Sequence, residues 1–163
     1  MHDNERRWIH ATWCDDIRHE VGNKTSLMGI YSSDLVVPAL PSVLHKLCVD
    51  IKLSTPRTRP FIALKLIIRV NDSFEPLAMI DIPSESSNKQ TPEELISYAE
   101  HVDEPKEAPR SIGFGVHIQI GPVPLSERAK WFQVIADFDG EIFESSKLCI
   151  YTPKHYLTAR SPE

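Results

Sequence analysis

Four long stretches of this chain alternate apolar with polar residues, and this period of two constrains the fold more than any other feature of the sequence. The stretches are residues 47–53, 62–70, 112–120 and 132–138. Because successive side chains of a β-strand point to opposite faces, the pattern predicts strands with one face on a core and the other in water. Shorter strands are predicted over residues 8–13, 25–32, 77–82, 141–143 and 147–151.

Turn residues separate these stretches. Asp139-Gly140 predicts a two-residue hairpin, because both central positions of a type I′ turn need a positive φ, and Gly22-Asn23 predicts another. The prolines fall mostly between the predicted strands, where they limit strand extension. The sequence therefore predicts a mainly β fold of about eight strands in two packed antiparallel sheets. A closed barrel is the alternative.

One segment breaks the β pattern. Thr91 is placed to cap a helix, Pro92 suits the first helical position, and Glu94 completes a capping box. Four apolar residues then recur at helical spacing, namely Leu95, Tyr98, Ala99 and Val102. We expect one α-helix over residues 92–102, within an insertion of residues 84–110. A further helical turn is expected over residues 43–45, after Pro41.

Length and charge bound the class of protein. A chain of 163 residues fits a single domain, here residues 1–163 with the insertion 84–110 inside it. The net charge of -5 argues against a nucleic-acid partner, because a duplex repels an acidic surface. No apolar run approaches ~18 residues, and no apolar region follows the first residues, so neither a membrane span nor a signal peptide is predicted.

The three cysteines are Cys14, Cys48 and Cys149, and each lies in an apolar run. Their odd number and wide spacing suggest neither a disulfide framework nor a zinc pair. We expect buried free thiols, which favour a reducing compartment and therefore a cytoplasmic location.

The segment with the most distinctive sequence is the hairpin predicted within residues 13–31. There, charged and imidazole side chains gather between two apolar ends. Carboxylate oxygens are ligands of Ca²⁺, so Asp15, Asp16, His19 and Glu20 are candidates for a cation site. Their spacing matches no EF-hand loop. The structural interpretation, which we favour, is charge pairing across the hairpin.

A specific register follows if Gly22-Asn23 is a two-residue loop. Asp16 then faces Gly29, Arg18 faces Leu27, and an Asp16–Arg18 ion pair over the glycine is expected. The hairpin charges would then be structural.

Cys14 with His10 or His117 is a candidate pair of nucleophile and base. No helix N-terminus is predicted behind Cys14, and the neighbouring Asp15 and Asp16 would raise the pKa of its thiol rather than lower it. We therefore expect a structural thiol.

The hairpin also carries a resemblance. Cys14-Asp15-Asp16-Ile17-Arg18, followed by Lys24-Thr25-Ser26-Leu27-Met28-Gly29-Ile30-Tyr31, resembles the opening of an uncharacterised family of small bacterial proteins, a domain of unknown function. That family begins with a Cys-Asp-x-x-Arg…Lys-x-Ser-Leu-x-Gly-x-Tyr hairpin and a Leu-Pro step, which Leu40-Pro41 matches. The resemblance implies an immunoglobulin-like β-sandwich and no reaction. Residues 84–110 have no counterpart in it.

Together these observations favour a non-enzymatic cytoplasmic β-sandwich that acts through protein–protein contact and needs no cofactor. The candidate interaction surface is Asp15, Asp16, Arg18, His19, Glu20 and Lys24. One alternative is a small-ligand or divalent-metal module, with a hydrolase among the options, that uses the Asp15/Asp16/His19 region or His117. The other is a structural subunit of a larger assembly, including one of phage origin. The expected partner is a protein rather than nucleic acid or membrane, and a homo-oligomer stays open.

Overall fold

The computed structural model describes residues 6–22, 24–56, 59–71, 75–83 and 111–154. Twelve strands form in this part of the chain: β1 (Trp8–Glu20), β2 (Lys24–Ile30), β3 (Asp34–Val36), β4 (Ser42–Leu44), β5 (Leu47–Pro56), β6 (Ala63–Val70), β7 (Ala78–Pro83), β8 (Ser111–Ile120), β9 (Val123–Leu125), β10 (Trp131–Phe138), β11 (Glu141–Glu144) and β12 (Leu148–Tyr151). Every strand predicted from the alternation is present, and the mainly β fold is confirmed.

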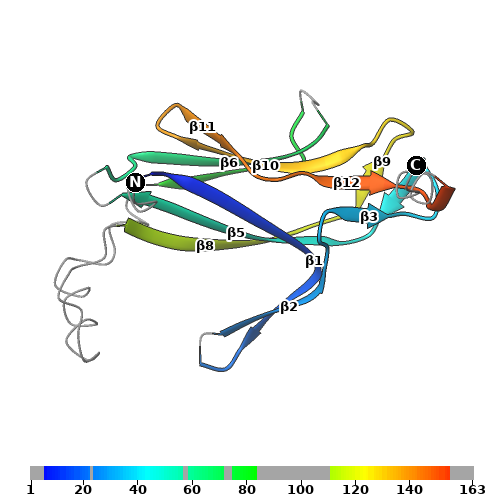
Figure 1. Cartoon of the computed structure of the whole chain (residues 1–163), viewed down its shortest axis with the longest axis horizontal. Helices are drawn as coiled ribbons and strands as arrows, with labels where there is room; N and C mark the ends of the chain where they lie inside the picture. The colour runs from blue at the N-terminus through cyan, green and yellow to red at the C-terminus, as the bar shows by residue number, and fades with distance from the viewer. Residues whose placement is uncertain (1–5, 23, 57–58, 72–74, 84–110, 155–163) are drawn as a thin grey trace, which may run out of the picture.

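The strands form two large sheets and one small one. The first sheet has the order β2-β1-β5-β8, and the second has the order β3-β12-β10-β6-β7 with β11 paired to β10. They pack as a sandwich, and the small β4-β9 sheet lies at the end away from the start of β1 (Figure 1). No helix in the described ranges is long and apolar enough to cross a membrane.

The strand order matches the immunoglobulin arrangement. In that arrangement strands A, B and E share one sheet, as β1, β5 and β8 do, and strands G, F, C and C′ share the other, as β12, β10, β6 and β7 do. The pairing differs from the predicted all-antiparallel sheets at one place, because β3 runs parallel to β12.

The core lies between the two large sheets. On β5, Leu47, Val49, Ile51 and Leu53 are fully buried, and they pack with the buried residues of β6 and β10. Trp13 of the first sheet meets Phe132 of the second, with ring centroids 5.7 Å apart. The alternation seen in the sequence therefore selects the residues that bury apolar surface between the sheets.

The predicted Asp139-Gly140 hairpin is confirmed. Asp139 has φ 56° and Gly140 has φ 91°, as a type I′ turn requires, and Phe138 pairs with Glu141 across it.

Two local predictions need comment. Residues 43–45 were predicted to form a helical turn after Pro41, which is wrong, because Ser42–Leu44 is strand β4 and pairs with β9. The predicted helix over residues 92–102 and the insertion 84–110 lie outside the described residues.

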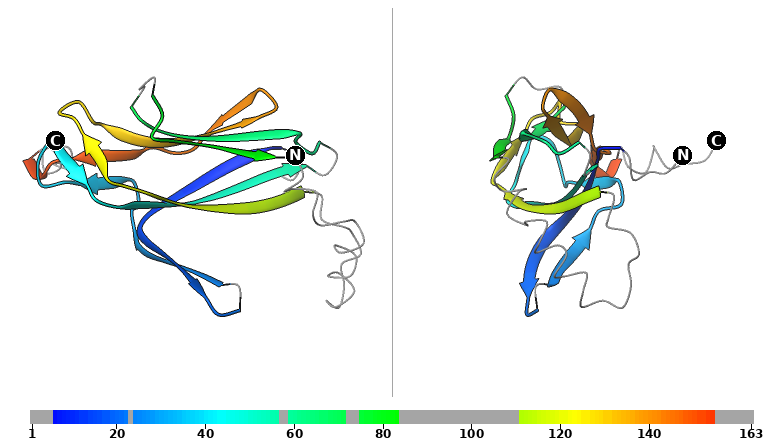
Figure 2. Two further views of the ribbon diagram at one scale, coloured as in Figure 1. Left: turned by 180° about the vertical axis from the view of Figure 1, so that it is seen from behind. Right: turned by 90° about the vertical axis from the view of Figure 1, so that its left-hand side faces the viewer.

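The first strand is longer than predicted, and its second half leaves the sandwich. β1 pairs with β5 from Trp8 to Cys14 and then continues to Glu20 paired with β2 alone. Residues 15–22 and 24–30 form a two-stranded hairpin, called the arm below. Figures 1 and 2 show the arm pointing away from both sheets.

Candidate functional site

The register of the arm differs by one residue from the predicted one. Glu20 pairs with Lys24, Arg18 with Ser26, and Asp16 with Met28, so three residues rather than two separate the strands. The glycine of β2, Gly29, therefore lies opposite Asp15 rather than Asp16. The two-residue loop predicted at Gly22-Asn23 is wrong.

Asp15 sits at the root of the arm, directly over Gly29. A Cβ atom on Gly29 would lie 2.0 Å from Asp15 Oδ2, and Gly29 has φ +64°, so this crossing requires a glycine. The Tyr31 hydroxyl donates a hydrogen bond to Asp15 Oδ1. Burial and this hydrogen bond raise the pKa of Tyr31, so its hydroxyl stays protonated and available to the carboxylate.

Asp16 takes part in two ion pairs on the arm root. Arg18 Nε lies 3.2 Å from Asp16 Oδ2, which confirms the predicted Asp16–Arg18 pair, and Lys46 Nζ contacts Asp16 Oδ1. The hydrogen bonds from Lys46 and Arg18 hold the pKa of Asp16 below its usual value. Both charged partners reach Asp16 from outside the core, so these pairs orient the arm without burying charge.

His19 joins the arm to the body of the sandwich. Its ring lies 5.1 Å from the ring of His117 on β8, centroid to centroid, at an interplanar angle of 42°. His117 Nε2 in turn lies 3.1 Å from Asp50 Oδ1 on β5, where the Asp50 side chain is only 5% exposed. Asp50 was not predicted from the sequence as a site residue. Its indication in the sequence was a polar residue on the predicted strand 47–53. In the structure Asp50 lies directly opposite His117 in the β5–β8 register.

The contact between Asp50 and His117 does not have the geometry of a hydrogen bond. Although their atoms are 3.1 Å apart, Asp50 Oδ1 accepts no well-formed hydrogen bond within the described part of the chain. Lys52 Nζ is 3.9 Å from the other oxygen, Oδ2. Asp50 is therefore a largely buried carboxylate whose charge is balanced only by the nearby His117 and Lys52 side chains among the described residues.

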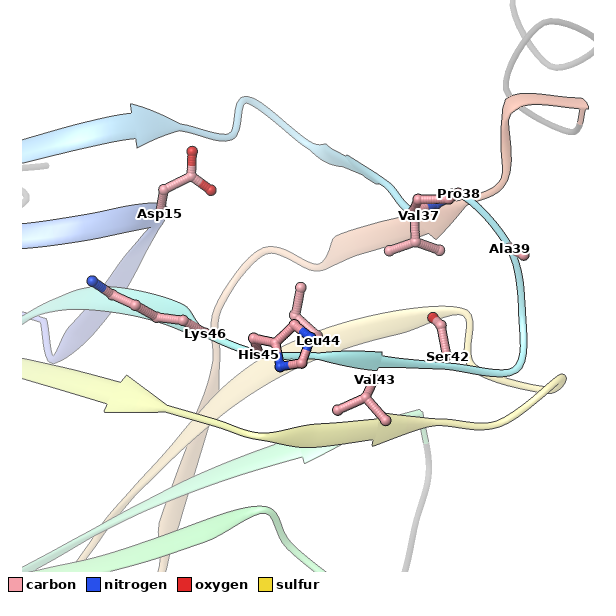
Figure 3. Close-up of a pocket in the computed structure, with 9 residues that line it drawn as sticks. All are labelled: Asp15, Val37, Pro38, Ala39, Ser42, Val43, Leu44, His45 and Lys46. Atoms are coloured by element: carbon pink, nitrogen blue, oxygen red, sulfur yellow. The ribbon is translucent and has the colours of Figure 1, made fainter.

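A pocket of about 600 Å³ opens beside the arm root. Asp15 and Lys46 lie at one end of it, and Ala39 and Ser42 lie at the other, as Figure 3 shows. The remaining lining is mostly apolar and comes from residues 37–38 and 43–45. Since Asp15 and Lys46 already have partners, the pocket offers an apolar wall with few free polar groups.

Cys14 is not placed as a nucleophile. It is fully buried, and burial is the main cause that raises the pKa of its thiol to about 11. Its cross-strand partner on β5 is Cys48, whereas His10 pairs with Lys52 and His117 pairs with Asp50. The predicted buried free thiols are confirmed for Cys14 and Cys48, and Cys149 is partly buried.

The candidate cation ligands have separate partners. Asp15 accepts from Tyr31, Asp16 pairs with Arg18 and Lys46, and His19 lies against His117. Among the residues that the structure describes, no group of three His, Cys, Asp or Glu side chains is arranged to hold a metal ion.

The arm exposes apolar side chains beside its charges, from its tip to its root. Val21 at the tip is 97% exposed and Ile30 is 57% exposed, with Met28 also exposed between them and the Glu20–Lys24 pair close by. The charged residues were predicted from the sequence as a contact surface, and these apolar residues were not.

Comparisons of the chain with models of known protein families, with curated proteins and with solved structures returned no match. The fold and the site together define a class, a β-sandwich of immunoglobulin-like topology with a projecting two-stranded arm.

Proposed function

We propose that this protein is a non-enzymatic β-sandwich that acts through protein–protein contact, and that the arm is its contact surface. The observation that carries the proposal is the shape of the arm, a hairpin that leaves the sandwich with one strand edge open and apolar side chains exposed. The candidate residues of the sequence analysis all lie on it, namely Asp15, Asp16, Arg18, His19, Glu20 and Lys24.

The open edge supports a particular mode of contact. β2 is the last strand of its sheet in the described part of the chain, so the outward N–H and C=O groups of its seven residues have no strand beside them. An extended segment of a partner can add to such an edge through main-chain hydrogen bonds, while side-chain contacts supply specificity. Val21, Met28 and Ile30 would supply the apolar contacts, and the flanking charges would fix the register.

The test is affinity capture with matched variants. Ile30→Ser on the arm is compared with Ile142→Ser on β11, because the two isoleucines are 57% and 55% exposed and both lie on strands. The proposal expects a partner that the wild type and Ile142→Ser capture equally and that Ile30→Ser loses by about tenfold, the effect of losing one well-packed apolar contact. Capture of the same proteins by all three forms would contradict it.

The location and the family of the protein are part of the same proposal. We propose a cytoplasmic protein of the bacterial family described above, and the free thiols of Cys14 and Cys48 support a reducing compartment. Fractionation of the source cells tests the location.

A structural role in a larger assembly is the second candidate. It is favoured by β8, a ten-residue strand with no Lys, Asp, Glu or Pro that is the last strand at the other end of the first sheet among the described residues. Unprotected edges of this kind pair readily with other chains. Light scattering separates the roles, because a stable assembly of this chain alone favours the structural subunit and a monomer favours contact with a different protein.

A further inference from the structure

Cys14 and Cys48 lie directly opposite each other at the point where the arm leaves the sandwich. They are the last residue pair of the β1–β5 ladder, and they are 0% and 1% exposed. Opposite residues of an antiparallel ladder have Cα atoms ~4.5–5.5 Å apart and side chains on the same face. Disulfides span Cα separations of ~4.4–6.8 Å, so the backbone already lies within reach of a bond.

The surroundings of the two thiols agree with this placement. After burial, a thiolate on Cys48 is the next largest cause that raises the pKa of Cys14. The Cys48 thiol also lies 3.6 Å from the carbonyl oxygen of Asp15, the first residue of the arm. Both cysteines are therefore part of the packing that sets where β1 departs from β5.

We infer that Cys14 and Cys48 form a reversible disulfide across the root of the arm by exchange with a small-molecule disulfide of the glutathione type. The two thiols are buried in the closed ladder, so exchange proceeds when the last β1–β5 pair opens locally and exposes them. In the first step a protein thiolate attacks one sulfur of the small disulfide, its S–S bond breaks, and one small thiol leaves with a proton. In the second step the other protein thiolate attacks the protein-bound sulfur, the Cys14–Cys48 bond forms, and the second small thiol leaves with a proton. The pair is oxidised by two electrons, and the small disulfide is reduced to two thiols.

The geometry indicates why the bond would be reversible. Opposite residues in a ladder hold their Cβ atoms ~4.5–5.5 Å apart, whereas a relaxed disulfide needs ~3.5–4.5 Å. Closing this gap strains the ladder, and strained disulfides are easier to reduce. The bond would therefore form under oxidising conditions and open again in a reducing cytoplasm.

The disulfide would act on the arm through its root. A bond at the last β1–β5 pair would prevent Cys14 of β1 from separating from β5. It would therefore fix the point from which the arm projects. This consequence does not depend on whether the arm binds a partner, so the inference stands or falls separately from the proposed function.

The experiment is oxidation of the folded protein in buffers of oxidised and reduced glutathione, approached from both directions until the result stops changing. Tryptic cleavage places the three cysteines in different peptides, residues 8–18, 47–52 and 148–154, so mass spectrometry reads the pairing directly. We expect peptide 8–18 joined to peptide 47–52 in oxidising buffer, with the mass lowered by two hydrogens. We expect both peptides to return to free thiols in excess reduced glutathione.

Two cysteine variants serve as controls for this experiment. Cys149→Ser leaves only the pair and should behave as the wild type, whereas Cys48→Ser should give no joined peptide. Circular dichroism confirms that each form stays folded. Oxidised protein that carries only mixed disulfides, that links through Cys149, or that stays reduced at every ratio would overturn the inference, as would a Cys14–Cys48 bond that resists excess reduced glutathione.

Discussion

The carboxylate of Asp15 lies directly over the α-carbon of Gly29, so close that a methyl group on residue 29 would come within 2.0 Å of Asp15 Oδ2. The Tyr31 hydroxyl holds this carboxylate from the other side. These three residues form the root of the arm, and the position of the arm depends on the absence of a side chain at residue 29.

Replacing Gly29 by Ala should therefore destabilise the protein by about 1–3 kcal/mol, because Gly29 has φ +64° and the new methyl group displaces Asp15. Gly22→Ala is the matched control. Gly22 has φ +81°, but nothing lies within 4 Å of its Cβ position, so it should lose only the backbone part, about 1 kcal/mol. Urea unfolding measures both. Equal losses in the two variants would show that the contact between Asp15 and Gly29 does not matter.

The far end of the sandwich depends on Asp139 and Arg7. Arg7 Nη2 donates to Asp139 Oδ2 at 2.9 Å, and the backbone N–H groups of Ile62 and Ala63 donate to Oδ1 at 2.9 and 2.8 Å. Partial burial raises the pKa of Asp139, but the hydrogen bonds from Ala63, Ile62 and Arg7 lower it by more, so the folded pKa lies below its usual value.

This shift sets a pH dependence with a definite sign. A carboxyl whose folded pKa is depressed stabilises the protein fully above its unfolded pKa of ~3.9, and that stabilisation is lost as the pH falls through the folded value. Asp139→Asn keeps the turn and the acceptor for Ile62 and Ala63 but removes the charge. We expect it to cost about 1–2 kcal/mol at pH 7 and to make stability less dependent on pH below pH ~4. Parallel acid profiles for the two proteins would contradict this account.

His117 should stabilise the protein mainly because it faces the buried carboxylate of Asp50. His117→Ala leaves that carboxylate with the ion pair to Lys52 at 3.9 Å, and the expected loss is about 1–3 kcal/mol. In an Asp50→Asn background the same substitution should cost distinctly less, because no charge is left unpaired. A double-mutant cycle by thermal unfolding measures the difference, and a coupling energy near zero would argue against the pairing.

The fold could be predicted from the sequence because burial between two sheets selects every second residue. On β8, Ile112, Phe114, Val116 and Ile118 turn inward while the intervening residues face out, as the alternation indicates. The three-residue strands β3, β4 and β9 could not be predicted in this way. β4 is a strand because it pairs with β9, about eighty residues further along the chain, and no local pattern encodes that contact.

The site was predicted in part. The Asp16–Arg18 pair needed only local spacing, and it is present. The register was missed because the ladder starts at Glu20–Lys24, with one more residue in the loop than a Gly-Asn turn implies. A strand over residues 8–13 and a hairpin within residues 13–31 were predicted separately, and the structure joins the two because β1 runs unbroken through Asp15 and Asp16. They remain in a strand because that strand projects into water, where charged side chains carry no burial cost.

The central claim is that the arm meets a partner, and site-specific photo-cross-linking inside the source cells tests it most directly. A photoreactive amino acid replaces Met28 on the arm in one form and Ile142 on β11 in the other, since both side chains are exposed on strands. The account predicts a discrete cross-linked product from position 28 that is absent from position 142 and lost when Ile30→Ser is added. Cross-linking from position 142 alone, or no product from position 28 in folded protein, would contradict it.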